Sequence, residues 1–168
     1  MSSPPRITGR RRSAAGPAYT AAAVALGYAA VSLYWALGGW AGLATVGGYP
    51  ARMARAGGPA VAVVLWTTVA AKVGGALLAL ALTPRFAGRL PRRPVRVVAG
   101  AGSLVLILYG GVLVLAGVLV ETGAIRVTGG VDWRALRWHT GLWDLWYLVW
   151  GVLLAVAVRR ARADPAPG

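Results

Sequence analysis

Long apolar blocks alternate along this chain with short segments rich in arginine, glycine and proline. Four of the blocks are long enough to cross a hydrocarbon core of about 30 Å as a helix. They are residues 18–37, 60–82, 97–120 and 136–158, and none has an interior proline. Because lipid offers the backbone no hydrogen-bond partners, each block is predicted to be helical. The pattern therefore predicts an all-α integral membrane bundle of four transmembrane helices.

The polar segments predict the rest of the organisation. Residues 1–17 are expected to be a disordered basic cytoplasmic tail, 18–158 the four-helix transmembrane domain and 159–168 a short cytoplasmic tail. An inner loop is expected at 83–96, and outer loops at 38–59 and 121–135. Within the first outer loop, 51–56 is predicted to be a short interfacial helix.

Arginine counts predict the orientation. Twelve arginines would lie on the side of both termini: Arg6, Arg10, Arg11, Arg12, Arg85, Arg89, Arg92, Arg93, Arg96, Arg159, Arg160 and Arg162. Five would lie on the other side: Arg52, Arg55, Arg126, Arg134 and Arg137. Cytoplasmic loops carry the excess of Lys and Arg, so the chain is predicted to be N-in and C-in.

Composition narrows the class of protein. The chain is 58% hydrophobic and 13% charged, which excludes an ordinary soluble domain. Its net charge of +14 comes from arginines between apolar blocks rather than from a recognition motif, so lipid, not nucleic acid, is the expected partner. Cysteine is absent, histidine occurs once, and no nucleotide, hydrolase or zincin motif is present. We therefore predict no catalytic, cofactor-binding or metal-binding residues.

Two opposite charges lie well inside the blocks. Lys72 is near the middle of the second, where a lysine costs about 2.5–3.5 kcal/mol on insertion scales. Asp144 lies in the fourth, seven residues after Arg137. The lysine side chain leans toward the helix N-terminus, so its amine can reach the depth of Asp144 if the two helices touch. Three interpretations stay open: a structural ion pair, a functional polar site such as a relay or an anion or substrate site, and no contact.

Two further residues complete the candidate polar site. His139 precedes Asp144 by five residues, about 140° around an ideal helix, so the two are not expected to share a face. It is interpreted as an interfacial hydrogen-bonding residue, with a metal ligand or pH sensor as the alternative. Glu121 continues a stripe with Ser103, Gly110 and Gly117, which predicts that it faces the bundle. Glu121, His139 and Asp144 together would be an alternative outer metal site.

Three segments carry a family resemblance: YWALGGW at 34–40, LILYGGVLV at 106–114 and DWRALRWHTGLWDLWYLVWG at 132–151. With them, residues 18–158 resemble a family of small actinobacterial membrane proteins known as a domain of unknown function. The resemblance implies a four-helix inner-membrane protein and transfers no activity, cofactor or catalytic residue.

Three function classes follow. The first is a structural or accessory membrane component, in a homo-oligomer or a larger complex, favoured by the lack of catalytic motifs. The second is a small transporter or permease that uses Lys72 and Asp144. The third is an outer-face ligand binder or enzyme that uses Glu121, His139 and the nearby aromatic residues.

Overall fold

The computed structural model of the chain describes residues 14–86 and 89–163, and within these ranges it contains helices and no strand. The helices are α1 (Ala15–Ala36), α2 (Leu43–Val46), α3 (Gly48–Ala56), α4 (Pro59–Ala81), the 3₁₀ helix η1 (Pro84–Phe86), α5 (Arg92–Glu121), α6 (Trp133–Trp138), the π-helix η2 (His139–Trp143) and α7 (Asp144–Ala163). Four of the helical segments are long and apolar enough to cross a membrane: α1, α4, α5 and the run from α6 to α7. The predicted all-α fold with four such helices is confirmed.

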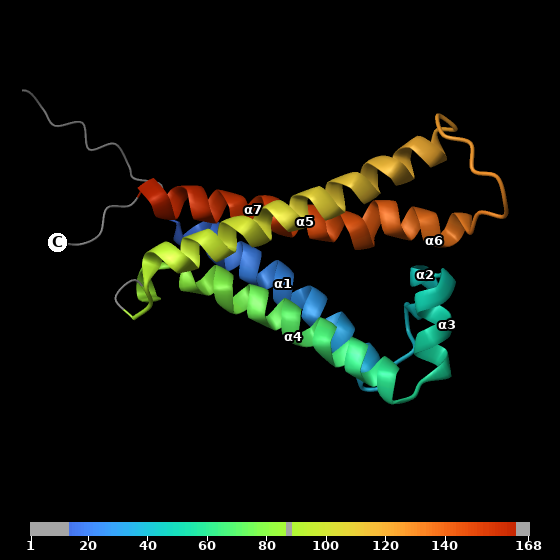
Figure 1. Ribbon diagram of the computed structural model, residues 1–168, viewed down its shortest axis with the longest axis horizontal. Helices are drawn as coiled ribbons and strands as arrows, with labels where there is room; N and C mark the ends of the chain where they lie inside the picture. Colours follow the sequence, from blue (N-terminus) through green and yellow to red (C-terminus); the bar gives the residue numbers. More distant parts are fainter. Residues whose placement is uncertain (1–13, 87–88, 164–168) are drawn as a thin grey trace, which may run out of the picture.

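The long helices form two antiparallel pairs. α1 packs along α4, α5 packs along α7, and α1 also contacts α7. Figure 1 shows that the two pairs meet near the start of α1 and the end of α7 and diverge toward the other end. There α2 and α3 lie across the opening. We call these the closed end and the open end of the bundle.

Small side chains hold the closed end together. Its core consists largely of fully buried alanines from α1, α4, α5 and α7, namely Ala18, Ala21, Ala25, Ala79, Ala99 and Ala157. Leu154 and Val158 of α7 fill the remaining space. Without a hydrophobic driving force in lipid, helix association depends on such close packing.

Glycines bring α5 and α7 into backbone contact. A Cβ added at Gly110 would lie 2.5 Å from the backbone nitrogen of Leu148, and one at Gly151 would lie 2.8 Å from that of Ile107. Ser103, Gly110 and Gly117 are buried along this contact, as their stripe predicts. Glu121, the next member of the stripe, is exposed, because it ends α5 one turn beyond the contact of Gly117 with Thr140. The prediction that Glu121 faces the bundle is wrong.

The helix ends differ from the predicted spans. α1 begins at Ala15 and α7 continues to Ala163, so both extend into segments predicted to be tails, while residues 1–13 and 164–168 lie outside the described residues. α5 begins at Arg92, inside the predicted inner loop, because an arginine-rich helix can continue beyond the apolar block that hydropathy detects. The predicted interfacial helix at 51–56 is part of α3.

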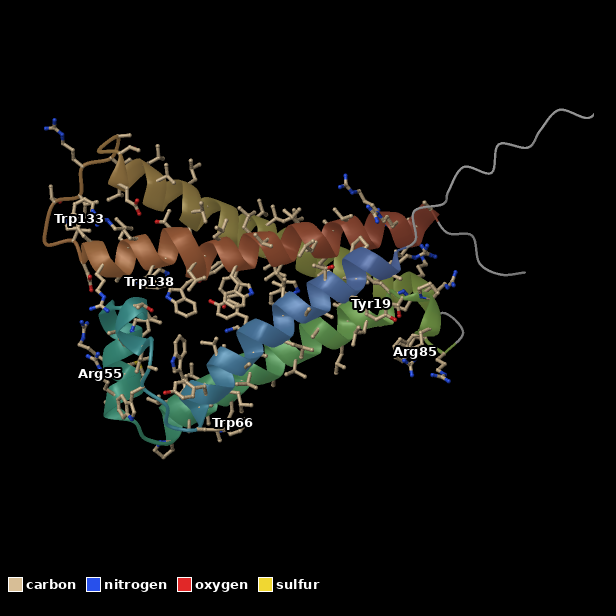
Figure 2. The ribbon with its side chains drawn as sticks, turned by 180° about the vertical axis from the view of Figure 1, so that it is seen from behind. Tyr19, Arg55, Trp66, Arg85, Trp133 and Trp138 are labelled. Carbon is tan, nitrogen blue, oxygen red and sulfur yellow. The ribbon has the colours of Figure 1, made fainter. Side chains whose placement is uncertain are left out.

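Arginine side chains gather at both ends of the bundle, as Figure 2 illustrates with Arg85 near η1 and Arg55 on α3. The described ends of the chain, in α1 and α7, lie together at the closed end (Figure 1). This arrangement agrees with an even number of crossings. The side of the membrane that each end faces stays a prediction.

Candidate functional site

Lys72 projects from α4 toward α1 and α7 in the interior of the bundle, where it is only 5% exposed. Its Nζ donates a hydrogen bond of 2.6 Å to Ser32 Oγ on α1. The same nitrogen lies 3.6 Å from the ring centroid of Tyr28 and 5.8 Å from that of Tyr147. A cation this close to an aromatic face is stabilised by the ring quadrupole, most strongly where water is excluded. Within the part of the chain that the structure describes, one hydroxyl and two rings are thus the polar and aromatic contacts of this cation.

The rings around Lys72 form a continuous aromatic wall across three helices. Tyr28 of α1 stacks on Trp143 of η2 and on Trp146 of α7, with centroid separations of 6.0 and 4.9 Å. It also contacts Tyr147 at 4.9 Å. Trp35 meets Trp143 edge-on at 5.4 Å. Trp143 and Trp146 therefore pack on α1, and the wall links the two helix pairs beyond the closed end.

A hydrogen-bonded pair lies in the wall of the open end. His139 Nδ1 is 3.2 Å from Asp144 Oδ1, and Asp144 is 6% exposed. The expectation that these residues lie on different faces is wrong, because they bracket the π-helix η2, in which residues five apart are hydrogen-bonded neighbours. The backbone N–H of Asp144 donates to the His139 carbonyl in the same turn.

The hydrogen bonds define how many protons the pair holds. His139 Nε2 lies 3.0 Å from the carbonyl oxygen of Val46, which only accepts, so Nε2 carries a proton. The contact between Nδ1 and Asp144 requires one more proton, on either the ring or the carboxyl group. In both forms the pair is neutral overall. The pair as a whole therefore adds no net charge to the open end.

Hydrogen bonds also fasten α2 to this turn. Trp143 Nε1 donates to Thr45 Oγ1 at 3.1 Å, beside the contact of His139 with Val46. Gly47 follows with a φ of +62°, and a Cβ there would meet the Ala135 side chain of α6. Glycine tolerates the positive φ and, because it has no Cβ, also leaves room for the Ala135 side chain. The short helix α2 is thus a fixed part of the open end.

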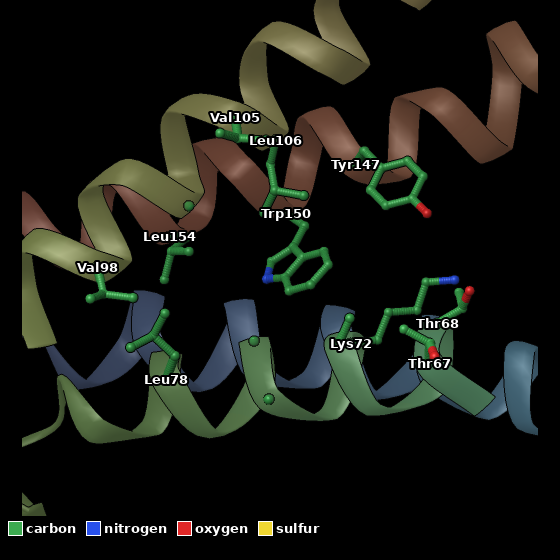
Figure 3. Close-up of a pocket in the computed structure, with 14 residues that line it drawn as sticks. Thr67, Thr68, Lys72, Leu78, Val98, Val105, Leu106, Tyr147, Trp150 and Leu154 are labelled. Carbon is green, nitrogen blue, oxygen red and sulfur yellow. The ribbon is translucent and has the colours of Figure 1, made fainter. Parts of the chain in front are cut away.

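Two cavities adjoin Lys72. The first, which we call the open-end cavity, has a volume of about 300 Å³ and lies among α1, α2, α3, α4, α5, η2 and α7, with Lys72, His139 and Asp144 in its wall. The second, the α4–α5 groove, has a volume of about 770 Å³ (Figure 3). Thr68, Lys72 and Tyr147 line both. Lys72 therefore stands at the junction of the two cavities.

The Lys72–Asp144 ion pair considered from the sequence does not form. In the described ranges, no carboxylate pairs with Lys72, and Asp144 is paired with His139 instead. Both residues line the open-end cavity, but α4 packs on α1 rather than on α7. Tyr28 and Ser32 of α1 take the place that Asp144 was expected to fill.

Glu121 is exposed and lines none of the cavities described above. No group of three or more His, Cys, Asp or Glu side chains that could hold a metal ion occurs within residues 14–86 and 89–163. The alternative metal site of Glu121, His139 and Asp144 is therefore not assembled.

The sequence did not identify Tyr28, Ser32, Thr45 or Val46 as members of the site. Tyr28 and Ser32 are four residues apart, a spacing that places them on the same face of α1, and both are buried. However, a serine and a tyrosine in an apolar helix do not by themselves indicate a binding site. Val46 acts through its backbone carbonyl, which any residue could supply.

Four helices able to span a bilayer, with a polar site enclosed among them, define a multi-pass membrane protein of the helical-bundle class. Residues 25–154 match the family described as Protein of unknown function (DUF3995), so the chain belongs to that family. The match confirms the resemblance to a family without an assigned function, and it includes every candidate site residue. No curated protein and no solved structure matches the chain.

Proposed function

We propose that this protein binds an anionic group in the open-end cavity of its bundle, with Lys72 as the counter-charge. The observation that carries the proposal is the buried Lys72 ammonium, whose contacts are one hydroxyl and the rings of Tyr28 and Tyr147. A lysine in a membrane helix is expensive and marks a functional site by default. The neutral His139–Asp144 pair does not compensate its charge.

Charge and shape support an anion rather than a neutral ligand. Hydrogen bonds to an oxyanion from a charged donor are about twice as strong as neutral ones, and burial strengthens them further. The cavity of about 300 Å³ lies at the lower end of the range for small-molecule sites. Tyr109 also lines it, and its hydroxyl offers a further donor to the same ligand.

The test compares wild type with Lys72→Met and Lys72→Arg in nanodiscs of phosphatidylcholine. Hexanoate is the probe, with chloride at equal ionic strength as the reference, and thermal unfolding is the readout. We expect hexanoate to raise the Tm of wild type and Lys72→Arg but not of Lys72→Met. Without ligand, Lys72→Met should be at least as stable as wild type, because it removes a buried charge that has no carboxylate partner.

Two results would overturn the proposal. One is an equal response of wild type and Lys72→Met to hexanoate. The other is a large loss of stability in unliganded Lys72→Met, which would make the lysine a structural element held by Ser32 and Tyr28. Transport of the bound anion across the bilayer is the stronger form of the proposal, and it predicts a Lys72-dependent flux of hexanoate in liposomes.

The second candidate is a structural or accessory component of a homo-oligomer or larger membrane complex. It is favoured by the exposure of two helices: 17% of an 18-residue apolar stretch is buried in α4 and in α5, against 39% in α1 and in the last span. Such faces contact either lipid or a partner helix. A stable stoichiometric partner that persists in Lys72→Met would support this candidate over the first.

The setting of either function is a bacterial plasma membrane, with both termini in the cytoplasm. The support is the arginine excess at the closed end, where η1 and the adjoining ends of α5 and α7 carry Arg85, Arg92, Arg93, Arg96, Arg159, Arg160 and Arg162. Because the chain has no cysteine, single cysteines at Arg85 and Thr128 would report the orientation by labelling with an impermeant maleimide. Labelling of Arg85→Cys by a reagent added outside intact cells would contradict the proposed orientation.

A further inference from the structure

The α4–α5 groove has one polar end and one apolar end. Figure 3 shows Thr67, Thr68, Lys72 and Tyr147 toward one end and Leu78, Val98 and Leu154 toward the other, with Trp150 between them. α4 and α5 contact each other little along their length, so the groove separates the helix pairs on this side. Glycines widen it, since a Cβ at either Gly74 or Gly102 would meet nothing within 4 Å.

We propose that the anionic ligand is an amphiphile, with its acidic head at Lys72 and its hydrocarbon chain along the α4–α5 groove toward the closed end. This inference rests on the proposed function, because it needs Lys72 as the counter-charge. Its independent basis is the adjacency of the two cavities, which share Thr68, Lys72 and Tyr147 as lining residues. The polarity of the groove matches that of a molecule with one charged end.

Charge complementarity selects this occupant over a neutral one. The cation at the polar end has no carboxylate partner among the described residues, so a neutral lipid would leave it uncompensated. The apolar end offers aliphatic and indole surface, against which a hydrocarbon chain can pack by van der Waals contact. The groove of about 770 Å³ is within the usual range of small-molecule sites.

A short soluble anion would use only half of this arrangement. Butyrate or phosphate can satisfy Lys72 in the open-end cavity, but it leaves the wall formed by Leu78, Val98 and Leu154 without a partner. A long-chain carboxylate and a lipid phosphate share the required chemistry, an oxyanion on a hydrocarbon chain. The two sources are separated by using palmitate and phosphatidic acid as separate probes.

The experiment fills the distal groove without touching Lys72. Gly102→Trp places an indole in the open space of the groove, and Val112→Trp places the same side chain on an exposed position of α5 that lines no described cavity. Both proteins and wild type are reconstituted in phosphatidylcholine nanodiscs. A photoreactive diazirine analogue of palmitate is crosslinked and mapped by mass spectrometry, with hexanoate, palmitate, palmityl alcohol and phosphatidic acid as competitors.

In wild type and Val112→Trp we expect crosslinks on α4 and α5 at the groove, with palmitate competing at least tenfold more effectively than hexanoate. Palmityl alcohol should not compete, and phosphatidic acid should compete only if the head site accepts a lipid phosphate. In Gly102→Trp the crosslinks should fall at least fivefold, while the thermal response to hexanoate remains.

Failure of the inference differs from failure of the proposed function. If palmitate and hexanoate compete equally and Gly102→Trp changes nothing, the ligand is a soluble anion and only the amphiphile inference falls. If hexanoate produces no Lys72-dependent rise in Tm, the proposed anion site is itself wrong. If the probe does not label the groove and a helix of a copurifying protein occupies it instead, the amphiphile inference is wrong and the groove is a protein-binding surface.

Discussion

The closed and open ends of this bundle are built from different side chains. At the closed end, alanines such as Ala21, Ala79 and Ala157 are fully buried, and the helix pairs touch. At the open end, Tyr28, Trp143 and other aromatic residues fill the space between pairs that have moved apart, and cavities remain. Small residues let helices approach closely, whereas aromatic rings hold them at a distance.

The difference shows how the same four helices can provide both stability and a site. Lys72 is near the middle of α4, where the alanine core ends and the aromatic wall begins. A lysine within the alanine core would have neither room nor partners. At the transition it gains a hydroxyl, an aromatic face and two adjoining cavities. The closed end is thus the rigid scaffold, and the open end holds the polar side chains and the cavity of the candidate site.

The largest effect is expected from overfilling the closed end. Ala157→Leu adds a branched side chain at a position with no exposure, and it should lower the free energy of unfolding by about 3 kcal/mol. The matched variant Ala54→Leu makes the same change on α3 at the wall of the open-end cavity, where space is available, and should stay within about 0.5 kcal/mol of wild type. Reversible unfolding in mixed micelles measures both. Equal losses in the two variants would remove the distinction between the ends.

The sequence predicted the scaffold better than the site. Lipid enforces helices, so long apolar blocks are a direct signal, and all four spans were found with errors only at their ends. The errors have a common cause: hydropathy marks the hydrocarbon layer, whereas a helix such as α5 continues into the polar region through Arg92, Arg93 and Arg96.

The site was harder to predict because it depends on directions around a helix axis. The depths of Lys72 and Asp144 could be calculated from the rise per residue, and both do line one cavity. The side chains that Lys72 and Asp144 contact could not be calculated in this way. They depend on α1, which packs on both α4 and α7, and on a π-turn that changes the angle between His139 and Asp144. Thr140, whose hydroxyl bonds to the Leu136 carbonyl, and Gly141 are local features that accompany such irregular turns.

A smaller loss is expected from breaking the pair at the open end. His139→Leu leaves the buried Asp144 without its partner and the Val46 carbonyl without its donor, which should cost about 2 kcal/mol. The double variant His139→Leu with Asp144→Leu should recover most of this loss, because no buried carboxyl group is then left without a partner. A double-mutant cycle on thermal unfolding measures the coupling. Additive losses would mean that the two side chains do not interact.

The smallest effect is expected from detaching α2 at the open end. Thr45→Val removes the acceptor of Trp143 Nε1 and should cost about 1 kcal/mol, whereas Thr45→Ser keeps the hydroxyl and should match wild type. Because α2 is held by this bond and by the contact of His139 with Val46, the change should act locally. Hydrogen exchange should rise across α2 and α3 and remain unchanged in the alanine core. Faster exchange in α7 near Leu154 would instead show that the open end stabilises the closed end.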